Sequence, residues 1–274
     1  MSAKPLLPLI LLLAAAPARA QAPYGVFPHS YEIFQRLLAD PREIQLSASY
    51  YRQQGFNRAD AVLGNSWGMS RWYAQEGAWA LQWDLEAMAF SRFTLSGGIN
   101  EFETVDFFAN LPLEVRRGDC SGKFTFFHES SHLGDDYIRR TGDTGFRYSV
   151  EGLRAVISDD VDKRLRLYGG GAYLLHRVLE TGRGTLEAGF ELKSADLGIS
   201  ADYPCRLYLA QDIQSHQNAG WNLNSNTVLG ARVNFKEGLR AMRFFIGYFT
   251  GHSPYGQFYA RREHYAHVGV AFDL

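Results

Sequence analysis

Apolar and polar residues alternate with a period of two along most of this chain. In residues 44–50 each apolar side chain is followed by a polar one, and residues 79–85 and 244–248 repeat the pattern. Successive side chains of a β-strand point to opposite faces, so this alternation is typical of half-buried strands. Turn-forming groups such as Arg117-Gly118-Asp119 and Gly182-Arg183-Gly184 separate the segments. The pattern predicts an all-β protein.

Twelve strands are expected, and their number is even, as in bacterial single-chain barrels. They are predicted at 43–53, 59–74, 78–94, 102–116, 120–132, 145–158, 163–177, 184–194, 203–214, 222–235, 239–251 and 262–274. Most connections at one end of the strands are tight, whereas those at the other end include the longer segments 133–144 and 252–261. Short turns on one side and longer loops on the other are typical of outer-membrane barrels. We therefore expect a closed antiparallel transmembrane β-barrel over residues 43–274.

The N-terminal region differs from the rest. Lys4, the apolar run 6–16 and Ala18-Arg19-Ala20 have the form of a secretory signal peptide, which predicts cleavage after residue 20. Residues 21–42 are expected to form a short periplasmic helix or a plug-like lead-in, because the apolar positions of 31–38 have helical spacing and Asp40-Pro41 ends it.

Composition limits the compartment and the partners. No window after the signal peptide is apolar enough for a membrane helix, yet aromatic residues make up 14% of the chain, as barrels with aromatic girdles require. The net charge is −1 and the sequence has no stripe of basic residues, so no nucleic-acid partner is expected. The last strand, ending in Phe272-Asp-Leu274, resembles the insertion signal read by the barrel-assembly machinery. These features predict the outer membrane of a Gram-negative bacterium; a soluble periplasmic β-protein is the alternative.

The densest chemistry lies in residues 127–136. His128 and Ser130 are two positions apart, so on a strand they share one face, together with the apolar Phe124 and Phe126. That face should meet lipid, close to the outer rim of the barrel. A histidine base beside a serine hydroxyl is the arrangement that a serine nucleophile needs. A carboxylate would orient the histidine, and we expect Glu151 on the next strand to do so.

Other interpretations of this segment stay open. His128, Ser130 and His132 could form a polar network that holds the loop 133–144, since a buried network is tolerated when its members are satisfied. Asp143 is a second candidate for the orienting carboxylate. Glu129, Asp135 and Asp136 are hard oxygen ligands and predict a calcium site.

Several motifs together resemble the uncharacterised bacterial family known as domain of unknown function 1207. They are Leu38-Ala-Asp-Pro-Arg42, His128-x-Ser-Ser-His-Leu-Gly-Asp-Asp136, Tyr148-Ser-x-Glu151, Tyr168-Gly-Gly-Gly171 and Gly251-x-Ser-Pro-x-Gly-Gln257. The resemblance implies an outer-membrane location and no particular activity.

A second resemblance rests on His128 and Ser130. Outer-membrane phospholipase A and the lipid A 3-O-deacylase carry a His-x-Ser pair on a barrel strand, and these two residues match it. This similarity implies a lipid-facing hydrolase that acts on phospholipid or lipopolysaccharide esters, and the phospholipase implies calcium. The chain departs from the phospholipase at Ser131, where that family has an asparagine, and at Gly142, where that family has the amide that orients its histidine. A non-enzymatic barrel, either a narrow pore or a structural protein, is the other hypothesis.

Overall fold

The computed structural model describes residues 25–26, 33–74, 78–96, 99–235 and 240–273. The predicted signal peptide, residues 1–20, lies outside the described residues. No helix in the described ranges is long and apolar enough to cross a membrane.

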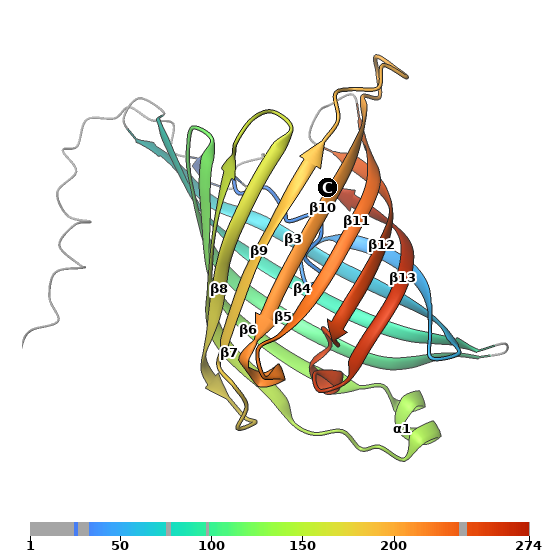
Figure 1. The fold of residues 1–274 in the computed structure, drawn as a ribbon. Coiled ribbons are helices and arrows are strands. Elements are labelled where there is room, and N and C mark those ends of the chain that lie inside the picture. The colour runs from blue at the N-terminus through green and yellow to red at the C-terminus, as the bar shows by residue number, and fades with distance from the viewer. Residues whose placement is uncertain (1–24, 27–32, 75–77, 97–98, 236–239, 274) are drawn as a thin grey trace, which may run out of the picture.

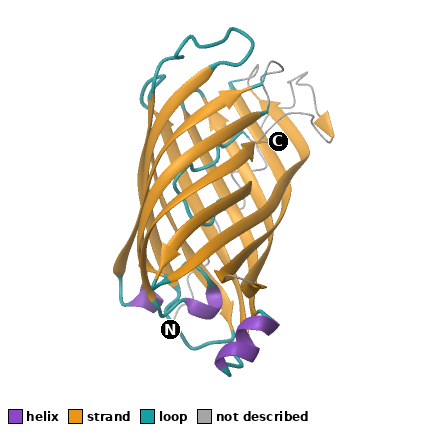
Figure 2. Ribbon diagram, turned by 90° about the vertical axis from the view of Figure 1, so that its right-hand side faces the viewer, coloured by secondary structure: helices purple, strands orange, loops and turns teal. Residues whose placement is uncertain are grey.

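Strands β2–β13 form one closed antiparallel barrel (Figure 1; Figure 2). Their bounds are β2 Leu46–Gln53, β3 Phe56–Ala74, β4 Trp79–Ser96, β5 Ile99–Arg117, β6 Cys120–Leu133, β7 Tyr148–Asp160, β8 Leu165–Arg177, β9 Gly184–Lys193, β10 Cys205–His216, β11 Asn222–Asn234, β12 Ala241–His252 and β13 Arg262–Asp273. Each strand pairs with its neighbour in sequence, and Phe272 of β13 stands opposite Leu46 of β2 to close the cylinder. The predicted closed antiparallel barrel of twelve strands is confirmed.

The two ends of the barrel differ. Helix α1 (Asp135–Thr141) and the short 3₁₀ turns η2 (Gln217–Ala219) and η3 (Gly256–Phe258) lie at what we call the α1 end. The opposite, terminal end carries the start of β2 and the finish of β13 (Figure 1). The two-residue strand β1 (Gly25–Val26) pairs there with the last part of β3. Loop 194–204 is an exception to the expected tight turns at the terminal end.

The polarity of the barrel is inverted relative to a water-soluble protein. Outward side chains include Leu63, Ile157 and Ile246, which are 64, 71 and 58% exposed. Inward side chains include many buried charges, among them Arg92 and Glu114 at 1 and 0% exposure. A barrel with every strand paired and an apolar exterior is stable in the hydrocarbon core of a membrane, because an unpaired N–H or C=O group there costs several kcal/mol.

Residues 33–45, which we call the lumen segment, run inside the barrel. The backbone N–H groups of Ile33 and Phe34 donate to Glu114 Oε2 at 2.7 and 3.0 Å, and that of Leu38 donates to Glu191 Oε1 at 2.9 Å. These donors are satisfied by carboxylates of the wall instead of by carbonyls one helical turn away. The short helix expected within 21–42 is therefore wrong for the described residues 33–42, which form bends, turns and irregular chain; residues 27–32 are not described.

Side chains of the lumen segment fill the space between the walls. Phe34 and Leu37 pack against Val156 and Tyr168 in one apolar cluster. The carbonyl of Ala39 accepts from Asn226 Nδ2 of β11 at 2.8 Å. The segment is thus anchored to several strands, and at this level side chains occupy the lumen.

Candidate active site

Strand β6 presents its reactive residues to the outside, as the alternation predicts. Phe124 and Phe126 are 48 and 39% exposed, whereas Thr125 and Ser131 are buried at 6 and 2%. His128 and Ser130 share the outward face with the two phenylalanines. Ser130 lies three residues before the strand ends at Leu133, next to α1. The pair therefore sits on the apolar exterior near the α1 rim.

A carboxylate joins His128 to a second histidine. Glu151 of β7 is the direct cross-strand partner of His128, and His128 Nδ1 lies 2.7 Å from Glu151 Oε1. The other oxygen of Glu151 lies 2.5 Å from Nδ1 of His176 on β8. The order is therefore imidazole, carboxylate, imidazole across three adjacent strands. With its Nδ1 facing the carboxylate, His128 has Nε2 left for chemistry.

His176 was missed by the sequence analysis. Its position became evident only with the register of β7 and β8, where it stands opposite Glu151 next to an irregularity at Glu151/Gly152. The alternation along β8 could have placed it on the outer face, but not beside Glu151, because strand register is not visible in one sequence.

Ser130 stands opposite Phe107 of β5 and Ser149 of β7. Residues two positions apart on one strand, such as His128 and Ser130, are separated by about 6.6 Å, because the rise is ~3.3 Å per residue. Among the described contacts, no hydrogen bond joins Ser130 to His128, so the two side chains must turn toward each other for proton transfer. Catalytic hydrogen bonds in ligand-free sites often tighten only when substrate binds.

The inner side of the same strand is held by the lumen segment. Arg42 Nη2 lies 2.6 Å from Asp106 and 3.3 Å from Glu129. Ser131 donates its hydroxyl to Asp106 and accepts from the N–H of Gln257 at 3.0 Å. Glu129 and Ser131, the neighbours of Ser130, are thus fixed from inside by the lumen segment and by the loop that contains η3.

The three carboxylates of the predicted calcium site are not brought together. Glu129 points into the lumen and pairs with Arg42, because it alternates with the outward His128 and Ser130. Asp135 and Asp136 lie in the first turn of α1, at the rim. Asp136 accepts from the N–H of Phe102 at 3.2 Å and from Arg139 at 2.5 Å, and these bonds lower its pKa. Within the described ranges, no group of three acidic, histidine or cysteine residues is arranged to hold a metal ion.

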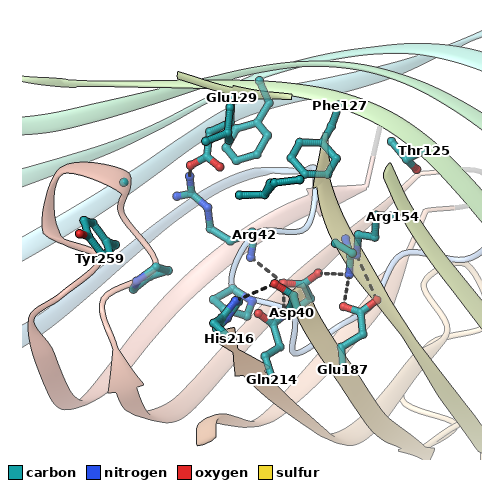
Figure 3. Close-up of a pocket in the computed structure, with 18 of the residues that line it drawn as sticks. Asp40, Arg42, Thr125, Phe127, Glu129, Arg154, Glu187, Gln214, His216 and Tyr259 are labelled. Carbon is teal, nitrogen blue, oxygen red and sulfur yellow. Dashed lines mark hydrogen bonds and ion pairs between the residues drawn. The ribbon is translucent and has the colours of Figure 1, made fainter. Parts of the chain in front are cut away.

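A second site opens inside the α1 end of the barrel. It is a cavity of roughly 210 Å³ between the lumen segment and the walls formed by β4–β12. Phe127, Glu129 and Arg154 approach it from the walls, while Asp40 and Arg42 approach from the lumen segment (Figure 3). Because Phe127 and Glu129 alternate with His128 and Ser130, strand β6 contributes to both sites, one on each face.

These features define the class of the protein: it is an outer-membrane β-barrel. The chain belongs to the family described as a protein of unknown function, DUF1207, whose model matches residues 13–274. No curated protein sequence matches the chain.

Two similar solved structures have the same fold. The chain is 12% identical to the outer membrane phospholipase of Salmonella typhi, solved as a dimer with bound calcium; the match covers 85% of this chain and 93% of that one, with a TM-score of 0.56. It is 13% identical to outer membrane phospholipase A from Escherichia coli, with 85% and 92% covered and a TM-score of 0.55. At such identities the likeness concerns the barrel alone.

Proposed function

We propose that this barrel is a serine hydrolase of membrane lipid esters in the outer membrane of a Gram-negative bacterium. The observation that carries the proposal is the 2.7 Å contact between His128 Nδ1 and Glu151 Oε1 on the lipid-facing side, two residues from Ser130. A carboxylate on Nδ1 fixes the tautomer that leaves Nε2 as a base, and it stabilises the imidazolium. The substrates would be phospholipid or lipopolysaccharide esters, whose acyl chains lie against this face.

The chemistry follows from these roles. His128 Nε2 takes the proton of the Ser130 hydroxyl as Oγ bonds to the ester carbonyl carbon, and then donates it to the departing alcohol. Water, activated by the same imidazole, releases the fatty acid and restores the serine. Calcium is implied by the similar phospholipase, but Glu129, Asp135 and Asp136 do not converge as ligands, so no step is assigned to it.

The test compares Ser130→Ala with Ser149→Ala, each reconstituted in phospholipid and lipid A vesicles with calcium supplied. Ser149 is the cross-strand neighbour of Ser130 and provides a matched serine at the same level. Ser130→Ala should lower kcat on the order of 10³-fold or more, because the nucleophile is lost, while Ser149→Ala should retain activity. Fatty acid release is measured by titration. Absence of release by the wild type, or equal activity of the two variants, contradicts the proposal.

A non-enzymatic barrel is the second candidate. The lumen segment favours a structural barrel over a narrow pore, since Asp40 and Arg42 join it to β7 and β5 through ion pairs of 2.6 Å with Arg154 and Asp106. In either case the final strand, β13, would be the part recognised by the barrel-assembly machinery.

A further inference from the structure

One carboxylate on the lipid-facing side of the barrel contacts two histidines. Oε1 of Glu151 on β7 lies 2.7 Å from Nδ1 of His128, and Oε2 lies 2.5 Å from Nδ1 of His176. An ionised carboxylate only accepts hydrogen bonds, so each Nδ1 that faces it carries a proton and donates. Both oxygens of Glu151 are thus occupied, one by each imidazole. The proposed reaction uses only the first of these two contacts.

The second contact depends on an extra residue in β8. Gly152 stands opposite Leu174 in the pairing of β7 with β8. Glu151 stands opposite His176, which leaves Leu175 without a partner in this pairing. If the register of the rest of the two strands continued, Leu175 would face Glu151 and an apolar side chain would replace the donor. A bulge of one residue changes which side chain faces the neighbouring strand, and bulges are frequent next to active sites.

The bulge is held in place by Arg183, which directly precedes β9. Nη1 of Arg183 donates to the carbonyls of Leu174 and Leu175 at 2.7 and 2.8 Å. The carbonyl of Arg183 accepts from the N–H of Leu174 at 3.0 Å. Carbonyls at a bulge lose their regular partners in the sheet, and a guanidinium has enough donors to satisfy two of them. His176 follows directly after these anchored residues, so its backbone is fixed opposite the carboxylate.

The two histidines are not equivalent. His128 has Ser130 two residues away on β6, where both side chains share the outer face. The corresponding neighbours of His176 are Leu174 and Val178, and neither carries a hydroxyl group. The His176 side chain is also more exposed, at 65% compared with 41% for His128. The contact of His176 with the site therefore runs through the shared carboxylate.

Glu151 needs this second donor because it has few partners on the outer face. Its side chain is 27% exposed, and the two imidazoles are its only hydrogen-bond partners among the described contacts. A glutamate side chain has several rotatable bonds, and a single hydrogen bond leaves much of this freedom. A donor on Oε2 restricts it, so Oε1 stays aligned with Nδ1 of His128. Alignment matters, since a displacement of about 1 Å at a reacting centre can lower a rate on the order of 10²-fold.

We propose that His176 is a positioning residue of this site: it holds Glu151 by the second oxygen and thereby keeps Nε2 of His128 available to Ser130. The kinetic consequence rests on the proposed function, whereas the contact among the three side chains is testable without substrate. A positioning role predicts a loss of kcat at unchanged KM, and rescue by another side chain that places an N–H group at the same point.

The kinetic test compares His176→Phe with His176→Asn in lipid vesicles, by titration of the released fatty acid. Phenylalanine keeps the ring and removes the donor, whereas the asparagine amide places an N–H group near the position of Nδ1. We expect kcat to fall about tenfold in His176→Phe with KM unchanged, and to stay within about threefold of the wild type in His176→Asn. His264→Phe is the matched control and should leave kcat unchanged, because His264 is exposed on β13 near the same end of the barrel.

A spectroscopic test follows the same contact without catalysis. Protein with isotope-labelled histidine in detergent micelles should show two imidazole N–H signals at low field, because a proton held between a ring nitrogen and a carboxylate is strongly deshielded. Glu151→Gln should shift both signals. His176→Phe should remove one signal and move or broaden that of His128, whereas His264→Phe should leave both unchanged.

The outcomes distinguish this inference from the proposed function. An unchanged His128 signal in His176→Phe overturns the inference, and so does an unchanged kcat or a loss that His176→Asn does not restore. Absence of hydrolysis by the wild type, together with the expected signal changes, would overturn the proposed function alone and would establish that His176 positions Glu151. If His176→Phe fails to fold, His176→Leu replaces it and is judged by the same results, because leucine is a common outward residue of this barrel.

Discussion

Arg42 gives the sharpest test of how the lumen segment is held. Its guanidinium lies 2.6 Å from Asp106 and 3.3 Å from Glu129, and it stacks over the rings of Phe90 and Phe108 at 4.2 and 4.8 Å. Arg42→Met preserves much of the apolar stem and removes the charge. Two carboxylates, with side chains 0 and 12% exposed, are then left inside the barrel without this cation.

The expected loss in the free energy of unfolding depends on the hydrogen bonds that those two carboxylates retain. Breaking a buried ion pair by removing one partner costs about 3–5 kcal/mol. Asp106 still accepts the N–H of Gly256 at 3.0 Å and the hydroxyl of Ser131, which places the expected loss near the lower end, at about 3 kcal/mol. Adding Asp106→Asn removes one of the stranded charges, and the double variant should recover at least about 1 kcal/mol.

The assay is urea unfolding in lipid vesicles, followed by tryptophan fluorescence and analysed by linear extrapolation. Arg164→Met is the control, because Arg164 is exposed in the turn between β7 and β8, where a substitution should change the free energy of unfolding by less than about 0.5 kcal/mol. A loss below about 1 kcal/mol for Arg42→Met, or no recovery in the double variant, would refute the assignment of Arg42 as the anchor of the lumen segment.

Three further predictions concern the lumen, the wall and the rim. Replacing residues 33–43 with a Gly/Ser linker of equal length should create conductance in planar bilayers where the wild type has none; a wild type that conducts equally would contradict the filled lumen. Gly170→Ala should destabilise the barrel by about 1–3 kcal/mol, since the new methyl group would overlap the Ala155 carbonyl, whereas Gly169→Ala, with its nearest neighbour at 3.6 Å, should be tolerated in the same unfolding assay. Because the pKa of Asp136 is lowered, the stability that this carboxylate contributes is complete above its ordinary pKa and is lost as pH falls through the lowered value. Pepsin cleavage of loop 134–147 should therefore accelerate below about pH 4 in the wild type relative to Asp136→Asn. The same pH dependence in both proteins would argue against this role of Asp136.

The local alternation of side chains was sufficient to predict the barrel and the outward-facing residues of the site. Period two depends only on the geometry of a single strand, so the outward orientation of His128 and Ser130 could be predicted without knowing any partner strand. The same rule placed Glu129 on the inner face and should have excluded it from a site shared with the rim residues Asp135 and Asp136. The alternation gives no information about which residue of a neighbouring strand, or of the facing wall, lies opposite a given side chain.

Contacts between distant segments were decided only by the closed barrel. Glu114 accepts the backbone N–H groups of residues 33 and 34 from 81 and 80 positions away, and Arg92 pairs with Glu263 across 171 positions. Such pairs depend on register and on which walls face each other across the lumen, and both are fixed only when β13 pairs with β2. Sequence alone therefore determined the cylinder and its two faces, because these follow from local geometry. The path of the lumen segment, the place of His176 beside Glu151 and the cavity at the α1 end required the tertiary structure, because the partners of buried charges are fixed only when the strands have closed around them.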